Sequence, residues 1–251
     1  MKNTEQETEK TFISGKNSVL EALKNNLVQI NKLFLSGSFS DPRIKHEVIS
    51  YTKEKKIPLL IVPEEKLNSL SSGKNHQGIV ASISPVKYVS VKEAIENNGN
   101  GRIILVAHEI EDNHNLGALI RTFLAGGGKT IILTGKSSVG INATTIKTSA
   151  NTLFHGTYAR ASNCVNVLSE LKKNNFWVVG TDNSKDSVSL YKADLPAKVA
   201  IVMGNEHEGL GPLIKKTCDF LVKIPIDQKV NSLNVSVAFG IILFEVLRQK
   251  Q

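Results

Sequence analysis

The stretch IPIDQKVNSLNVSVAFGIILFEVLRQ, residues 224–249, determines how the rest of the chain is interpreted. It opens with a proline-containing turn, continues as a polar loop, and ends in an apolar segment that predicts a helix over Val235–Leu247. Asn231, Ser232 and Asn234 lie where the loop becomes a helix. Because Ser and Asn side chains accept hydrogen bonds from free N–H groups at a helix start, these residues are equally typical of a capped core helix. The residues of other loops are therefore needed to distinguish a helix cap from a functional site.

The composition is that of a folded protein with an anionic partner. The 251 residues are 41% hydrophobic and 22% charged, enough for one large or two modest domains. Lysine and arginine number 31 against 23 aspartate and glutamate, and the net charge of +8 favours nucleic acid. Cys164 and Cys218 have no metal-ligand spacing, so we expect no metal. The polar N-terminus and the lack of an apolar run of about 20 residues predict a cytoplasmic protein without a membrane span.

The sequence predicts two domains, both of the α/β class. Residues 1–11 predict a disordered tail, 12–86 a small α/β domain, 87–101 a linker with one short helix, and 102–251 a second domain. In the first domain, helices are predicted at Ser18–Leu27 and Lys45–Lys56, and strands at Lys32–Leu35, Pro58–Val62 and His76–Ile83. In the second, strands are predicted at Ile103–Ala107, Thr130–Thr134, Trp177–Thr181, Ala200–Met203 and Phe220–Ile224, and helices near Leu116–Ala125, Asn166–Asn174 and Leu210–Lys216. Short apolar strands separated by helices indicate a parallel sheet covered on both faces.

Ligands bind such sheets beyond the carboxyl ends of the strands, and two loops there are polar. Asn115 and Arg121 follow the strand Ile103–Ala107, near a helix N-terminus that suits an anion. This loop alone favours the alternative, in which Asn115 caps the helix and Arg121 is solvated. The loop GNEHEGLG, residues 204–211, follows another strand and places Glu206 at a strand end. It matches neither the dinucleotide fingerprint nor a phosphate loop. These residues alone predict only a generic nucleotide-binding α/β enzyme.

Together the three loops resemble the three motifs of the SpoU (TrmH) family of RNA ribose 2′-O-methyltransferases, within the SPOUT superfamily. The matching residues are Asp112, Asn115, Gly117 and Arg121 in the first motif, Gly204, Glu206 and Gly209 in the second, and Ile224, Pro225 and Ser232–Ala238 in the third. The N-terminal region resembles the substrate-binding domain of ribosomal-RNA members through Ile13-Ser14-Gly15, Val19–Leu23 and His76-Gln77-Gly78. The resemblance covers about residues 12–250. It departs from the family at Asn113, which replaces a proline, and at Ser149–Thr152, which replaces a glycine-containing stretch.

The resemblance implies S-adenosylmethionine as methyl donor, bound in a deep trefoil knot at the C-terminal end of a SPOUT-type parallel sheet. By motif match the cofactor-binding residues are Gly204, Ile224 and Leu233, with Thr181 and Met203 as neighbours, although core packing alone would explain the Ile and the Leu. It further implies a homodimer formed through the knot region, with the apolar face of Val235–Leu247 contributing.

The resemblance also supplies candidate catalytic residues: Arg121, Asn115, Glu206, Ser232 and Asn234. We expect Arg121 to contact the ribose 2′-oxygen or its adjacent phosphate. Family proposals make this arginine a general base, but a guanidinium stays protonated, so positioning and electrostatic stabilisation are favoured. The other four residues would hold Arg121, the ribose and the cofactor in register.

The predicted function is S-adenosylmethionine-dependent 2′-O-methylation of ribosomal RNA, most simply 23S rRNA because of the N-terminal domain. Two alternatives stay open: a tRNA 2′-O-methyltransferase, and a non-catalytic RNA-binding ribosome-assembly factor. His76, His114 and His207 are expected to be solvent-facing loop residues or RNA contacts.

Overall fold

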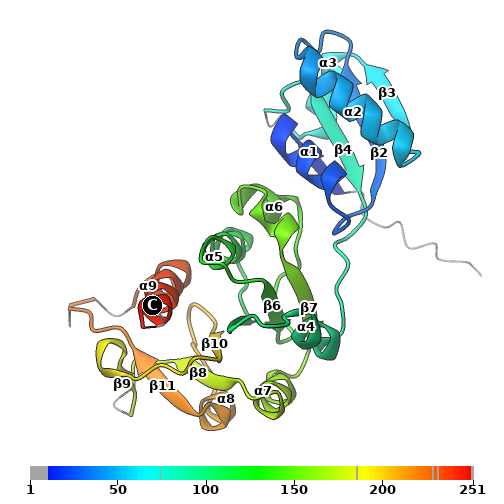
Figure 1. Ribbon diagram of the computed structural model, residues 1–251. Helices are drawn as coiled ribbons and strands as arrows, with labels where there is room; N and C mark the ends of the chain where they lie inside the picture. Colours follow the sequence, from blue (N-terminus) through cyan, green and yellow to red (C-terminus); the bar gives the residue numbers. More distant parts are fainter. Residues whose placement is uncertain (1–10, 74, 185, 228, 231, 250–251) are drawn as a thin grey trace, which may run out of the picture. The chain divides into compact units, whose positions relative to one another are not determined.

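The computed structural model describes residues 11–73, 75–184, 186–227, 229–230 and 232–249, and the chain divides into two compact units (Figure 1). One unit comprises the residues up to Lys87 together with Ile141–Lys147, and the other comprises Tyr88–Gly140 and the residues from Thr148 onward. Most of the expected tail, and Asn231 at the expected start of the C-terminal helix, lie outside the described residues. Within the described ranges, no helix is long and apolar enough to cross a membrane.

The N-terminal unit contains a four-stranded sheet in the order β1-β4-β2-β3. Strands β1 and β2 run antiparallel to β4, and β3 runs parallel to β2. The elements of this unit are β1 (Thr11–Ser14), α1 (Lys16–Lys24), β2 (Ile30–Ser36), α2 (Pro42–Glu54), β3 (Leu59–Val62), α3 (Glu64–Leu70) and β4 (Ile79–Ile83). Phe34, Leu67 and Val80 pack together beneath α3. The sequence predicted both long helices and three of the strands, but neither β1 nor α3.

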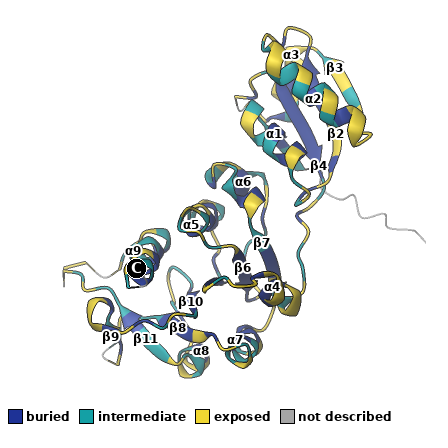
Figure 2. Cartoon of the chain, in the orientation of Figure 1, coloured by how far each residue is buried: buried dark blue, intermediate teal, exposed yellow. Residues whose placement is uncertain are grey.

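The second unit contains a seven-stranded parallel sheet in the order β7-β6-β5-β10-β8-β11-β9. Every strand pair in it is parallel, so the predicted α/β class with a parallel sheet is confirmed. The strands are β5 (Ile103–His108), β6 (Thr130–Thr134), β7 (Thr157–Ala161), β8 (Trp177–Thr181), β9 (Val188–Ser189), β10 (Val199–Met203) and β11 (Phe220–Lys223). All residues of β6 and β10 are buried (Figure 2), which explains why these strands are continuous apolar runs in the sequence.

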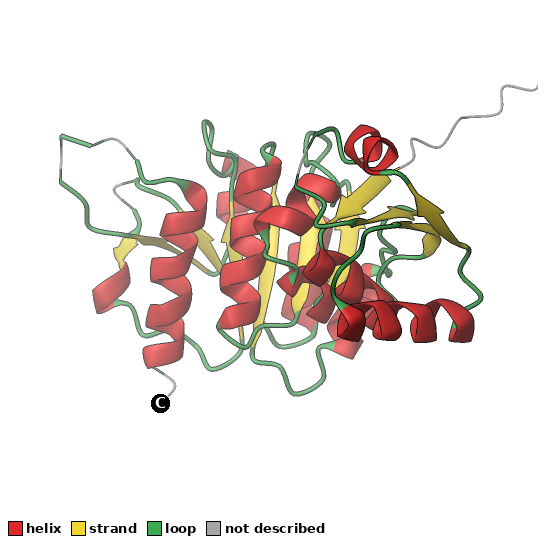
Figure 3. Ribbon diagram, turned by 90° about the horizontal axis from the view of Figure 1, so that it is seen from above, coloured by secondary structure: helices red, strands yellow, loops and turns green. Residues whose placement is uncertain are grey.

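Helices cover both faces of this sheet (Figure 1), and the helices of one face lie in front of the strands in Figure 3. Helices α5 (Asn113–Ala125) and α9 (Val235–Arg248) pack against each other on one face, and α4 (Val91–Asn97), α7 (Cys164–Lys173) and α8 (Pro212–Thr217) lie on the other. The remaining elements are α6 (Ala143–Thr148) and two 3-10 turns, η1 (Thr152–His155) and η2 (Leu190–Lys192). The short helix expected within residues 87–101 is α4.

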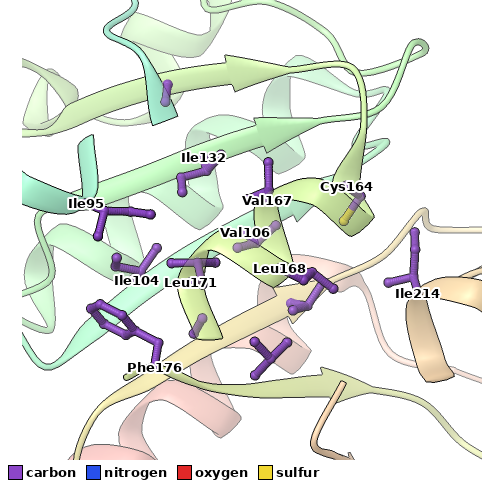
Figure 4. Close-up of a cluster of buried hydrophobic side chains, with 14 of the residues drawn as sticks. Ile95, Ile104, Val106, Ile132, Cys164, Val167, Leu168, Leu171, Phe176 and Ile214 are labelled. Carbon is purple, nitrogen blue, oxygen red and sulfur yellow. The ribbon is translucent and has the colours of Figure 1, made fainter. Parts of the chain in front are cut away.

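The core on the α7 face illustrates how the sequence builds this layer (Figure 4). Val167, Leu168 and Leu171 are spaced so that they share one side of α7, and all three are buried against the sheet. Asn163 begins the helix, because its side chain accepts a hydrogen bond from the backbone N–H of Asn166. Burying each such side chain contributes about 1.5–3 kcal/mol. The sheet is therefore held rigidly from this face, and its loops lie at the carboxyl edge.

Candidate functional site

Four loops of the second unit leave its sheet at the same edge. Strands β5, β10, β8 and β11 are neighbours and run parallel, so the segments that follow them emerge together. The start of α9 lies beside them. These segments line two adjoining cavities, which share the residues Glu206, His207, Ser232, Leu233 and Val235.

The first cavity has a volume of about 300 Å³, within the range of small-molecule sites. All five residues expected to bind a cofactor line it: Thr181, Met203, Gly204, Ile224 and Leu233. Val235, Ala238 and Ile242 of α9 add an apolar wall, and Asp182 and Asn183 add polar groups.

Gly204 permits a close approach of the backbone beside this cavity. A Cβ atom at this position would lie 2.4 Å from the carbonyl carbon of Gly209 and 2.8 Å from the backbone nitrogen of Leu210. Asn205 and Gly209 exchange two backbone hydrogen bonds, of 3.1 and 2.9 Å, and Gly209 adopts a φ of +66° that favours glycine. The glycines of the second motif are thus needed to close this loop into a tight turn.

The second cavity, of about 510 Å³, is lined by four of the five predicted catalytic residues: Asn115, Glu206, Ser232 and Asn234. The Asn115 side-chain amide donates to Glu206 Oε1 at 2.9 Å, and its oxygen accepts from Asn234 Nδ2 at 2.9 Å. Asn234 Oδ1 in turn accepts from the backbone N–H and the hydroxyl of Ser236. This chain of hydrogen bonds fixes the orientation of both amides and connects three loops that are distant in the sequence.

The N-terminal caps of α5 and α9 can be compared with the caps expected from the sequence. Asp112, not Asn115, caps α5: its Oδ1 accepts from the Asn115 N–H at 2.8 Å. The interpretation of Asn115 as the helix cap is therefore wrong, and its side chain is free to join Glu206 and Asn234. Asn234 caps α9, as the capped-helix interpretation predicts, and its Nδ2 also donates to Asn115.

Arg121 lies apart from the hydrogen-bonded side chains of Asn115, Glu206 and Asn234. It is exposed on the third turn of α5, lines neither cavity, and has no hydrogen bond or ion pair within the described part of the chain. Six residues of helix separate it from Asn115, which corresponds to about 9 Å along the axis and about 240° around it. A single chain thus does not bring Arg121 to the other four predicted catalytic residues.

The structure places the three histidines differently from one another. His76 is buried: its Nδ1 accepts from the Gly78 N–H, and its Nε2 is 3.2 Å from Asn68 Oδ1. The expectation of a solvent-facing His76 is therefore wrong, and this side chain fixes the turn that precedes β4. His114 and His207 are exposed, as expected.

Two residues that the sequence analysis did not single out organise the loops. Asn205 Nδ2 donates to the backbone oxygen of Glu109 at 3.1 Å, and its Oδ1 accepts from the backbone N–H of His207. Asp182, at the end of β8, pairs with Lys215 at 2.8 Å. Burial acts to raise the pKa of Asp182, but the Lys215 ammonium and hydrogen bonds from Ser184 and the Asn183 backbone together outweigh it, so the pKa lies below its usual value. Of the two, only Asn205 has a sequence signal, because a side chain that bonds its own loop is typical of turns rich in Gly and Asn.

The departure from the family pattern near α6 has a backbone explanation. Ala150 and Asn151 adopt φ values of +50° and +66°. This left-handed conformation is free of strain for glycine and tolerable for asparagine, but it is costly for alanine. Asn151, the departure within the family's glycine-containing stretch, thus keeps this conformation at little cost, whereas Ala150 bears strain.

Parallel strands with polar loops and paired cavities at their carboxyl edge define an α/β enzyme that binds a small molecule beside its reaction site. The family model described as the SpoU rRNA Methylase family matches residues 102–244, and the model for RNA 2′-O ribose methyltransferase substrate binding matches residues 12–89. The chain belongs to the SpoU rRNA methylase family, and it is an S-adenosylmethionine-dependent RNA 2′-O-methyltransferase.

Individual relatives match over nearly the full length. The chain is 36% identical over 239 residues to the 23S rRNA (guanosine-2′-O-)-methyltransferase RlmB of Neisseria meningitidis serogroup B, covering 95% of each chain. It is 35% identical over 243 residues to YacO of Bacillus subtilis (strain 168), named as a TrmH family tRNA/rRNA methyltransferase, covering 95% of this chain and 96% of YacO. The AdoMet-bound rRNA methyltransferase from Sinorhizobium meliloti superposes with a TM-score of 0.82 at 25% identity. The match covers 98% of this chain and 89% of that chain.

The first cavity fits S-adenosylmethionine, the family's cofactor. Asp182 Oδ2 is buried without a hydrogen-bond partner among the described residues, so it offers an acceptor to a hydroxyl or ammonium group of a ligand. The turn at Gly204 leaves backbone groups on the wall, and Leu233 and Ile242 provide an apolar surface for a purine ring. The described residues contain no group of three or more His, Cys, Asp or Glu side chains that could hold a metal ion.

Proposed function

We propose that the protein methylates a ribose 2′-hydroxyl of 23S rRNA. The observation that carries this proposal is the match to the N. meningitidis 23S rRNA methyltransferase over 95% of both chains, which includes the region matched by the substrate-binding model. RNA recognition is assigned to residues 12–86 and methyl transfer to residues 102–251, with 87–101 linking them. The reaction takes place in the cytoplasm, where ribosomal RNA is assembled.

The C-terminal segment is proposed to form a deep trefoil knot. After β11 the chain passes the first cavity at Ile224 and then enters α9, which packs on α5 and lies beside β10. Such a crossing would surround the cofactor with backbone from four segments. This explains why Gly204, Ile224 and Leu233 serve as cofactor positions although their side chains offer no polar group.

In the proposed mechanism the second cavity holds the target ribose. When bound in the first cavity, S-adenosylmethionine supplies a methyl group from its sulfonium. The Asn115–Asn234 pair, held by Glu206, can orient the ribose, because each side-chain nitrogen uses one N–H within the described part of the chain and has a second N–H to donate. Ser232 lies on the shared wall of the two cavities, where it can hydrogen-bond the ribose. The 2′-oxygen would accept the methyl group that the cofactor supplies, S-adenosylhomocysteine would be the leaving group, and the hydroxyl proton would pass to solvent.

Arg121 is proposed to act from a second copy of the chain. Val237 and Phe244 of α9 are 52% and 54% exposed, which makes this helix the proposed dimer surface. Because α5 and α9 pack side by side, a dimer through α9 also brings α5 and the exposed Arg121 towards the partner. The guanidinium would then hold the phosphate next to the target ribose and stabilise the charge that develops on the 2′-oxygen.

The test is transfer of a labelled methyl group from S-adenosylmethionine to unmodified 23S rRNA, with tRNA in parallel. We expect label in ribose 2′-O-methyl groups of 23S rRNA, and its loss in Arg121→Ala with S-adenosylmethionine binding unchanged. Label in tRNA alone would show that the substrate is tRNA and not 23S rRNA. Cofactor binding without transfer to either RNA would favour the ribosome-assembly alternative.

A further inference from the structure

A basic cavity lies at one end of the N-terminal unit. Its volume is about 600 Å³. Its lining comes from the end of α1 and the segment after it, the start of β2, the loop between α2 and β3, and the end of the unit, and it includes Lys55, Lys56 and Lys87. The lining contains three lysines, four side-chain amides and no carboxylate. Neither of the methyltransferase cavities contributes to it.

The three lysines, Lys55, Lys56 and Lys87, are exposed and form no ion pair within the described ranges. The Lys55 ammonium donates to the backbone oxygen of Leu23 and lies 6.0 Å from the centre of the Tyr51 ring, which fixes its direction at the rim. Uncompensated like charges repel one another, so their grouping on one cavity is unfavourable for the unit alone. An anionic ligand would remove that repulsion.

Backbone hydrogen bonds hold the loops of this cavity in place. Lys56 has a φ of +53°, and the turn around it is closed by the Ile57 N–H, which donates to the Thr52 oxygen at 2.8 Å. The Lys87 N–H donates to the Leu27 oxygen at 3.2 Å. The lysines are therefore presented from fixed backbone positions, and ordering them for a ligand costs little beyond side-chain freedom.

A second polar cavity of the same unit is electrostatically different. It lies at the other end of β2, beside Ser36 and Gly78, and it contains Lys16 and Glu64. The Lys16 ammonium is 3.4 Å from Asp41, so this cavity carries no uncompensated positive charge. A polyanion is thus attracted over long range more strongly to the basic cavity than to the cavity beside Ser36 and Gly78.

We infer that the basic cavity binds the sugar-phosphate backbone of the substrate RNA, with Lys56 and Lys87 each neutralising a phosphate. Lysine suits this role because its ammonium is a point charge that accepts many phosphate orientations. No aromatic ring lines the cavity, so it offers charge and amide hydrogen bonds but no stacking surface for a base. Contacts of this kind position an RNA and add affinity without reading its sequence. The inference rests on the proposed function, because it takes the substrate to be RNA.

The test compares Lys56→Gln/Lys87→Gln with the matched pair Lys45→Gln/Lys66→Gln, in the full-length protein. Lys45 lies in the first turn of α2 and Lys66 in α3, and neither lines the basic cavity. Affinity for unmodified 23S rRNA fragments is measured between 50 and 200 mM salt. The slope of log K against log salt is negative, and each lost phosphate contact makes it less steep by about 0.7–0.9. The Lys56→Gln/Lys87→Gln variant should therefore have a slope smaller in magnitude by about 1.4–1.8. At 0.1 M salt this corresponds to binding about 25- to 60-fold weaker.

Methyl transfer separates this inference from the proposed function. For Lys56→Gln/Lys87→Gln we expect a raised KM for RNA, an unchanged kcat, and unchanged S-adenosylmethionine binding and thermal unfolding. A slope and a KM equal to those of Lys45→Gln/Lys66→Gln would overturn the inference while the wild-type enzyme still methylates RNA. If the wild-type protein transfers no methyl group to any RNA, the proposed function fails instead. The slopes of log K against log salt then still show whether the basic cavity binds RNA.

Discussion

Complementation between two inactive variants tests whether Arg121 acts across a dimer. The variants are Arg121→Ala and Asn115→Ala. Asn115→Ala suits this purpose because Asp112 caps α5, so loss of the Asn115 side chain leaves the helix start intact and removes only the bridge to Glu206 and Asn234. Each variant alone should lose about 100- to 1,000-fold in kcat, the usual cost of removing one positioned polar group from a transition state.

The expected restoration follows from symmetry. In a heterodimer of the two variants, one site combines the intact cluster of the Arg121→Ala chain with the intact arginine of the Asn115→Ala chain. The other site lacks both groups. Because an isologous dimer has two equivalent sites, the heterodimer should recover about half of the wild-type activity. If Arg121 acts within its own chain, each site of the heterodimer lacks one group and no activity returns.

The assay uses co-expressed chains with two different affinity tags, so that sequential purification isolates the heterodimer. Methyl transfer is then measured per dimer at saturating S-adenosylmethionine and RNA. Activity near that of the single variants would refute action in trans and would require α5 to rearrange within one chain. A single purified chain with full wild-type activity as a monomer would refute the dimer itself.

Four further predictions concern the cofactor cavity and the stability of the second unit. Gly204→Ala should abolish S-adenosylmethionine binding by calorimetry, because its Cβ would collide with the Gly209 backbone; binding within twofold of wild type would contradict this. Ala150→Gly should stabilise the protein by about 0.5–1 kcal/mol in urea unfolding, since it relieves a left-handed alanine; an unchanged midpoint would show that the strain is absent. The Glu245 pKa is lowered to about 2 by hydrogen bonds from Arg248 and Gln249. The stability that these bonds provide is therefore present above about pH 4.5 and is lost as the pH falls towards 2, so the melting temperature should drop less steeply there in Glu245→Gln than in wild type. Burial raises the pKa of Cys218 to about 12, so alkylation of the native protein at pH 8, followed by mass spectrometry, should be roughly a thousandfold slower than in urea.

The strands inside the two sheets could be predicted from the sequence, whereas three of the four edge strands could not. Strands β6 and β8 have the predicted bounds, because a strand buried in a parallel sheet must be a continuous apolar run. The missed strands β1, β7 and β9 all lie at sheet edges. An edge strand pairs on one side only, so polar residues such as Arg160 of β7 are tolerated and the apolar signal is lost.

The candidate site was predictable as a set of residues but only partly as an arrangement. The motif spacing placed Asn115, Glu206 and Asn234 at strand ends of one sheet, and these three side chains are hydrogen-bonded to one another. Two details could not follow from spacing: Asp112 rather than Asn115 caps α5, and His76 is buried. Both depend on which backbone N–H groups are left free after folding, and several polar residues of each loop could supply the partner.

The sequence by itself determined the α/β class and the parallel sheet, because these follow from local periodicity, and its resemblance to the family's motifs implied the residues that gather at the carboxyl edge. Only the tertiary structure decided that the cofactor positions line one cavity, that the amides of Asn115 and Asn234 join 119 residues apart, and that Arg121 is exposed and lines neither cavity. It also gathered Lys56 and Lys87 on one cavity without a carboxylate. Such arrangements arise when the sheet brings distant loops together, and sequence separation carries no information about distance across a folded sheet.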